Sequence, residues 1–105
     1  MTKLIEERWL AEIRRIVAEQ LAEYSVDVYL FGSRARGDHQ VASDVDLAID
    51  PHGTLPPSAI SRLRDALEES RVPLWVDVVD LRTASATMVE RVRREGTKWI
   101  ASKSA

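Results

Sequence analysis

The sequence contains no cysteine among its 105 residues. Without thiols the chain can form neither a disulfide framework nor a thiolate metal site. Nothing in this composition indicates an oxidising compartment, and we therefore expect a cytoplasmic protein.

Long apolar runs and an excess of positive charge are also missing. Charged residues interrupt the N-terminal stretch "MTKLIEERWLAEIRRIVAEQ" every few positions, so neither a signal peptide nor a membrane-spanning helix is expected. Fifteen Lys and Arg against 17 Asp and Glu give a net charge of -2, whereas a duplex DNA binder usually carries a basic excess. Direct DNA binding is therefore not expected. The length predicts a single domain, residues 1–105, with one core and at most one site.

Apolar residues recur with the periods of helices and strands. Three- and four-residue spacing before position 22 predicts an amphipathic helix, and the next apolar run predicts a buried strand. Further along, we expect a helix capped by Ser58, a helix starting at Thr83 or Thr87, and a tail after Gly96 that docks on the core or faces a partner. The predicted strands are 26–31, 44–50 and 74–80. This order predicts an α/β or α+β fold with a small sheet covered by helices on one face.

Two aspartates lie one residue apart in the second predicted strand. Asp44 and Asp46 leave the same face of that strand, about 7 Å apart or less. Like charges this close raise each other's pKa unless a cation lies between them, and magnesium or manganese takes oxygen ligands of this kind. The pair therefore predicts a site for a divalent metal ion.

The third predicted strand offers two further carboxylates on opposite faces, so at most one can join the pair. We choose Asp77, because a buried mid-strand carboxylate is costly without a counter-ion, whereas Asp80 at the strand end can bond to a turn. Three carboxylates on one sheet face can hold two ions roughly 3.5 to 4 Å apart, an arrangement that serves phosphoryl and nucleotidyl transfer.

The turn after the first strand carries groups that bind phosphate. Gly32 and Ser33 can present backbone N–H groups and a hydroxyl to a triphosphate. Arg34 and Arg36 can neutralise phosphate charge by bidentate hydrogen bonds, or can be solvated loop charges. Gly37 lets the loop turn back toward the second strand.

The combined pattern resembles that of a known family. In "LFGSRARGD", "SDVDLAID" and "VDVVDL", a Gly-Ser pair, ten residues, a D-x-D pair and a later lone aspartate follow one another. This resembles the minimal nucleotidyltransferases of the DNA polymerase beta-like superfamily. The resemblance implies a small mixed sheet with helices on one side, with ATP as substrate and two magnesium ions as cofactors, manganese being an alternative. It also implies that the paired aspartates bind both ions and that Asp77 binds the ion that activates the acceptor hydroxyl.

The resemblance further implies a partner chain. Such short chains are commonly encoded beside a small all-helical protein of the HEPN type, as antitoxin and toxin or as catalytic and substrate-binding subunits. Some members transfer AMP from ATP to a tyrosine of that partner. The length agrees, because a chain of this size has little left after its catalytic core to build an acceptor pocket.

Two other functions compete with nucleotidyl transfer. The chain can be a non-catalytic antitoxin that blocks its helical partner by contact, although all the carboxylates are present. It can also be a metal-dependent glycosyltransferase, which uses paired carboxylates but needs a larger sheet than this chain can form. Transfer to an aminoglycoside lacks the extra domain that it would require.

The remaining polar and aromatic residues are expected to have mainly structural or surface roles. Asp50 is expected to cap a turn, and His39 and His52 are expected to be surface residues. Trp75 can stack on a base, pack under a helix or face a partner. The basic run "ERVRREGTK" is expected to be the solvated face of the last helix or a contact for an acidic partner.

Overall fold

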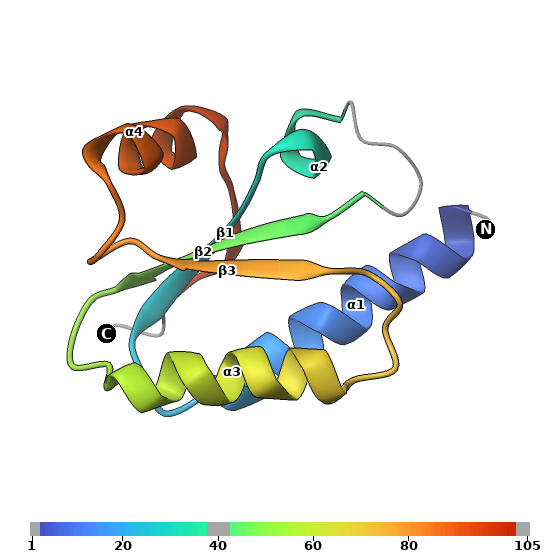
Figure 1. Ribbon diagram of the computed structural model, residues 1–105, viewed down its shortest axis with the longest axis horizontal. Helices are drawn as coiled ribbons and strands as arrows, with labels where there is room; N and C mark the ends of the chain where they lie inside the picture. The colour runs from blue at the N-terminus through green and yellow to red at the C-terminus, as the bar shows by residue number, and fades with distance from the viewer. Residues whose placement is uncertain (1–2, 38–42, 103–105) are drawn as a thin grey trace.

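The computed structural model describes residues 3–37 and 43–102, in which helices and strands alternate along the chain (Figure 1). No helix within these ranges is long and apolar enough to cross a membrane. Asp38 and His39 lie outside the described residues. The elements are α1 (Lys3–Gln20), β1 (Val26–Phe31), α2 (Ser33–Arg36), β2 (Val45–Pro51), α3 (Pro57–Glu69), β3 (Val76–Asp80), α4 (Ala86–Glu95) and β4 (Thr97–Ile100).

The strands form one mixed sheet in the order β3-β2-β1-β4. β1 runs antiparallel to both β2 and β4, whereas β2 and β3 are parallel. A parallel pair needs a crossover connection, and α3 supplies it. The predicted mixed α/β architecture is confirmed.

One face of the sheet carries the main core, beneath α1 and α3 (Figure 1). The alternation predicted for β2 is confirmed, since its odd-numbered apolar residues all point into this core. The fully buried members of the core are Ile13, Val17, Val28, Val45, Leu47, Ile49 and Leu63. Burial of these side chains at roughly 1.5 to 3 kcal/mol each fixes the register of β2, and with it the face on which Asp46 appears.

The opposite face carries a second, smaller apolar cluster, formed by Phe31, Ala48 and Val92. The long helices α1 and α3 share one face as expected, and the shorter α2 and α4 lie on the other side of the sheet (Figure 1). Val92 of α4 covers the apolar residues that β1 and β2 turn to this side. The face with the aspartates is therefore flanked by helices and not open throughout.

The C-terminal segment forms a fourth strand that the sequence did not reveal. β4 pairs with β1, and Trp99 and Ile100 pack against the main core. Of the two alternatives for this segment, docking on the core is confirmed. Its four residues are too few to show an alternating pattern.

Two predicted helix starts were wrong. α3 has Pro56 as N-cap and Pro57 as its first residue, so Ser58 caps nothing. Proline is suited to this position because its missing N–H would have no partner there. At α4 the N-cap is Ser85, whose hydroxyl accepts a hydrogen bond from Met88 N at 3.1 Å. Thr83 instead donates its hydroxyl to Asp80 O at 3.3 Å in the preceding turn.

Candidate active site

The turn after β1 lies directly against β2. Gly32 has a φ of 76°, and a Cβ at this position would collide with Oδ2 of Asp46. A side chain here is disfavoured by the positive φ and would have to displace the neighbouring carboxylate. Gly32 is also the N-cap of α2, so that Ser33, partly buried, is the first helical residue and does not itself cap the helix. This close approach places the Gly32–Ser33 turn beside the carboxylate of Asp46.

Three carboxylates gather on this face, and we call them the Asp46 group: Asp44, Asp46 and Asp77. Asp46 and Asp77 are register partners on the parallel strands β2 and β3, and Asp44 immediately precedes β2. Asp46 is partly buried, and Asp44 and Asp77 are exposed. Burial raises the pKa of Asp46, and the charges of Asp77 and Asp44 raise it further. The group therefore concentrates negative charge that the surrounding protein only partly offsets.

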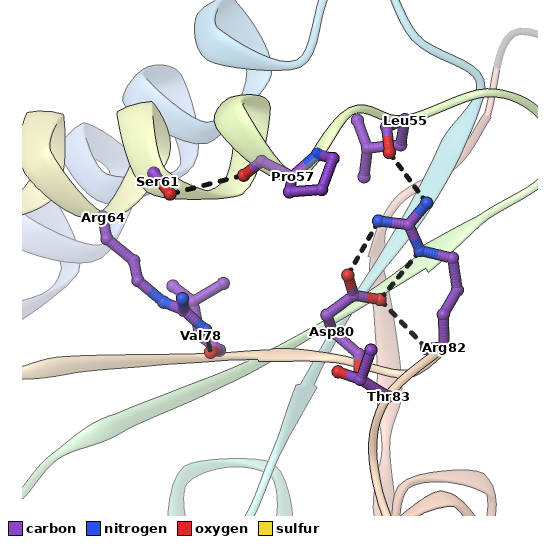
Figure 2. A network of polar contacts seen from close by, with 8 residues as sticks. All are labelled: Leu55, Pro57, Ser61, Arg64, Val78, Asp80, Arg82 and Thr83. Carbon is purple, nitrogen blue, oxygen red and sulfur yellow. Dashed lines mark hydrogen bonds and ion pairs between the residues drawn. The ribbon is translucent and has the colours of Figure 1, made fainter.

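The two aspartates of β3 have different surroundings. Asp77 shares the site face by strand parity, but it is exposed, so the burial cost expected for it was wrong. Asp80 binds the following turn as predicted, because its Oδ1 accepts a hydrogen bond from Arg82 N at 2.9 Å. The Arg82 guanidinium also lies 2.8 Å from Oδ2 and lowers the pKa of Asp80 (Figure 2). Asp80 is thus compensated by the turn and is not part of the Asp46 group.

Arg34 lies away from the position expected of a phosphate ligand. Its side chain is 2% exposed and forms an ion pair with Glu6 of α1. Its Nε and Nη2 donate to Ser43 O at 3.1 and 2.9 Å. Glu6 and Ser43 thus engage all three guanidinium nitrogens. Arg34 therefore ties the residue before Asp44 to α1, and the structure does not bring its guanidinium to the Asp46 group.

Two other arginines lie near the Asp46 group. Arg36 of α2 and Arg91 of α4 each place a guanidinium nitrogen 3.2 Å from Oε2 of Glu95. Both positive charges partly counteract the rise in the pKa of Asp46. Arg91 also lies over the Phe31 ring, 5.8 Å from its centroid. Glu95 therefore joins one cation from each flanking helix beside the acidic site.

Arg91 was not among the predicted site residues, because the basic run was expected to be a solvated face or a contact for an acidic partner. Arg93 and Arg94 belong to the same run and are exposed, so local composition does not single out Arg91. The packing of Val92 on the sheet decides which of these arginines turns toward Phe31 and Asp46. The helical spacing of Arg91 and Glu95 was the one available signal, and it is common in solvated helices.

A second group of possible metal ligands lies elsewhere on the same strands, and we call it the Asp27 group: Asp27, Asp50 and His52. One ligand atom from each lies within 4.8 Å of the others, whereas the Asp46 group is not drawn together to this extent in the described structure. Like-charged carboxylates without a cation between them favour wider separation.

The buried carboxylate of Asp27 already has partners. It accepts a hydrogen bond from Ser102 N at 2.7 Å and contacts His52 Nε2 at 2.7 Å and Lys98 Nζ at 3.4 Å. Burial alone would raise the pKa of Asp27, but these three contacts together lower it. His52 is exposed, as expected of a surface residue, yet it forms a specific pair. Asp50, expected to cap a turn, lies opposite Asp27 in the register of β1 and β2.

Comparison with known proteins agrees with this geometry. The family "Polymerase beta, Nucleotidyltransferase" matches residues 12–104. Over 90 residues the chain is 36% identical to a Haemophilus influenzae protein named "Probable protein adenylyltransferase MntA", covering 86% of this chain and 77% of that protein.

Two solved structures share the fold. A crystal structure of a toxin–antitoxin with AMP-PNP has a TM-score of 0.67 at 29% identity, covering 86% of this chain and 74% of that one. A structure of tri-AMPylated Shewanella oneidensis HEPN toxin in complex with MNT antitoxin has a TM-score of 0.65 at 26% identity, covering 92% and 73%. With its sequence, its mixed sheet and its carboxylates in agreement, this chain belongs to the polymerase beta nucleotidyltransferase family.

Proposed function

We propose that residues 1–105 act as one nucleotidyltransferase domain that moves AMP, or another NMP, from an NTP to a hydroxyl of a partner protein. The acceptor is a tyrosine of a HEPN-type toxin, and the chain acts as the antitoxin. The observation that carries this proposal is the Asp46 group, three like-charged carboxylates beside a glycine turn. The named activity of the Haemophilus relative and the AMPylated toxin in the neighbouring structure support it.

The donor set of the Asp46 group fits magnesium, with manganese as an alternative. All the donors are carboxylate oxygens, and the raised pKa of Asp46 indicates a site where a cation would be favourable. Asp44 and Asp46 would hold two ions and Asp77 one of them. Ions bound there would neutralise charge on the phosphates and make the acceptor hydroxyl easier to deprotonate.

The nucleotide would occupy the side of the Asp46 group nearer β1. The Gly32–Ser33 turn lies against Asp46 and would offer its backbone N–H groups and the Ser33 hydroxyl to phosphate oxygens. Arg36 and Arg91, which both contact Glu95, would supply positive charge near Asp46. Arg91 takes the role first expected of Arg34, whose guanidinium is engaged by Glu6 and Ser43.

The transfer is a substitution at the α-phosphorus of the NTP. The acceptor oxygen forms a bond to this phosphorus while the bond from phosphorus to the bridging oxygen breaks. Pyrophosphate leaves with the bonding electron pair, and the hydroxyl proton passes to solvent. The chain's own contribution is to position both reactants in line and to offset the negative charge.

The test is an intact-mass measurement on the chain co-purified with its partner from native cells, after addition of magnesium and ATP. We expect AMP units on the partner, absent with Asp46→Asn and retained with the matched control Asp50→Asn from the same strand. Undiminished transfer by Asp46→Asn would refute the metal assignment.

A contact-blocking antitoxin is the alternative, because the neighbouring structures are toxin–antitoxin complexes. It would be favoured if no chain changed mass with any NTP and if Asp46→Asn neutralised the partner as well as wild type does. Membership of the polymerase beta family removes the glycosyltransferase alternative.

A further inference from the structure

An apolar groove of about 510 Å³ runs between α3 and the outer side of β3. Its apolar lining includes Leu67, Val72, Leu74 and Val78, and Trp75 and Asp77 line it as well. We call it the Trp75 groove. Asp77 also belongs to the Asp46 group, so the groove and the candidate active site meet at this residue on the edge of the sheet.

The backbone of β3 is open on the groove side. β3 is the outermost strand of the sheet, and in the described ranges it pairs with β2 alone. Val45 N donates to Trp75 O at 2.8 Å, so Val76 and Val78 turn their backbone groups outward. Arg64 covers one of these groups by donating to Val78 O at 2.8 Å (Figure 2). An edge strand left this open beside apolar surface is suited to receive another polypeptide.

Trp75 is unusually exposed for a tryptophan. Its exposed fraction is 67%, and among the large apolar side chains of the described residues only Leu4 on α1, at 68%, is as exposed. Exposed aromatic side chains next to an apolar groove are typical of protein contacts. Of the readings left open for Trp75, packing under a helix is therefore excluded by its exposure.

The layout of the sheet helps to decide whether Trp75 stacks on a base or contacts a partner. The turn at Gly32 follows β1, and Arg91 lies over Phe31 at the end of β1. Trp75 lies beyond β2, on the side of β3. If phosphates bind between the turn and Arg91, the opposite side of the Asp46 group is left for the acceptor. An in-line transfer requires such an approach from two sides.

We propose that the Trp75 groove binds the hydroxyl-bearing segment of the acceptor polypeptide, an inference that rests on the proposed function. Trp75 and Asp77 are two residues apart, about 6.6 Å along the chain. A tyrosine with its hydroxyl at Asp77 can thus set its ring against the indole of Trp75. The apolar lining takes neighbouring side chains of the segment, and the open edge at Val76 takes its backbone.

The test compares Trp75→Ala with wild type in AMP transfer to the partner purified from the complex. We expect the KM for the partner to rise about tenfold or more, and direct binding of the partner to weaken by a similar factor. Affinity for magnesium and AMP-PNP should stay unchanged, and Trp75→Phe should restore most of the partner binding. Leu4→Ala is the matched comparison, because it removes an equally exposed apolar side chain from a different element, α1, which does not line the groove.

Two results would overturn the inference. Loss of AMP-PNP affinity with an unchanged KM for the partner would make Trp75 a base-stacking residue. Unchanged partner binding by Trp75→Ala would show that the groove is not the docking surface, and this readout needs no catalysis. Failure of the proposed function would give a different result from either of these, because wild type itself would then transfer no AMP. The effect of Trp75→Ala on partner binding could still be measured in that case.

Discussion

The Asp27 group and the Asp46 group lie at opposite ends of β2, and each contains an aspartate of this strand, Asp50 in the first and Asp46 in the second. Asp27 is buried, yet its pKa is lowered, because Ser102 N, His52 and Lys98 more than offset the cost of burial. Asp46 is less buried, yet its pKa is raised, because burial adds to the repulsion from Asp77 and Asp44. The more buried carboxylate is thus the better stabilised of the two.

This difference is the one expected between a structural carboxylate and the proposed metal-binding one. Asp27 attaches the end of β4 to β1 through Ser102 and Lys98, and its charge is used within the fold. Asp46 keeps like-charged neighbours whose effect Arg91 and Arg36 offset only in part, as expected of a carboxylate that binds a cation. The proximity of ligand atoms alone would have selected the Asp27 group. The balance of charge around each carboxylate is the better guide.

The largest expected effect comes from closing the space beside Asp46. Gly32→Ala introduces a methyl group into the carboxylate of Asp46, at a φ that already disfavours alanine. We expect transfer to fall by about 100-fold or more, since small displacements of catalytic groups are costly. Gly37→Ala is the control, because it has a similar φ of 84° but no atom within 4 Å of the added methyl. Equal losses in the two variants would show that backbone strain alone is responsible.

Removal of Asp27 should affect stability rather than activity. Asp27→Ala leaves Ser102 N and Lys98 without this acceptor, so we expect the free energy of unfolding in urea to fall by about 2 kcal/mol. Transfer per folded molecule should stay near the wild-type rate. If Asp27→Ala abolished transfer without a loss of stability, the Asp27 group would be the functional one.

The pH dependence of unfolding sharpens the same contrast. The pKa of Asp27 is lowered in the fold, so its contribution is present above the pKa of the unfolded chain and is lost as pH falls through the folded pKa. Wild type should therefore exceed Asp27→Asn in stability by about 1 kcal/mol at pH 7, and the difference should vanish in strong acid. Urea titrations between strong acid and pH 7 measure this difference in the free energy of unfolding. A difference that is independent of pH would contradict the assigned charge contacts.

The smallest expected effect is a gain in stability. Without divalent ions, Asp46→Asn removes repulsion and should raise the free energy of unfolding by at most about 1 kcal/mol, because the carboxylate is partly exposed. Since the folded pKa of Asp46 is raised, wild type loses stability as pH rises through that pKa. The extra stability of Asp46→Asn over wild type should therefore disappear in acid. Thermal unfolding with a chelator present is the measurement. A lower Tm for Asp46→Asn at neutral pH would contradict like-charge repulsion at this site.

Local patterns were sufficient to predict the framework of the site but not its cations. Alternation in β2 set the face of Asp46, and strand parity set that of Asp77, because the period of two is fixed by the backbone. The contacts of Arg34 and Arg91 were not predicted, since they involve Glu6 and Phe31, 28 and 60 residues away in the chain.

The fourth strand shows the same limit. β4 has only four residues, and its pairing with β1 is decided by an open sheet edge far away in sequence. The caps of α3 and α4 were also missed, because several Ser, Thr and Pro residues in one loop can each start a helix.

Calorimetric titration of manganese in the presence of AMP-PNP tests the central claim most directly. Wild type, Asp46→Asn and Asp27→Asn would be compared under identical conditions. We predict that Asp46→Asn weakens manganese binding by about tenfold or more and that Asp27→Asn leaves it unchanged. Wild-type affinity in Asp46→Asn, with binding lost in Asp27→Asn, would contradict the account and move the metal site to the Asp27 group.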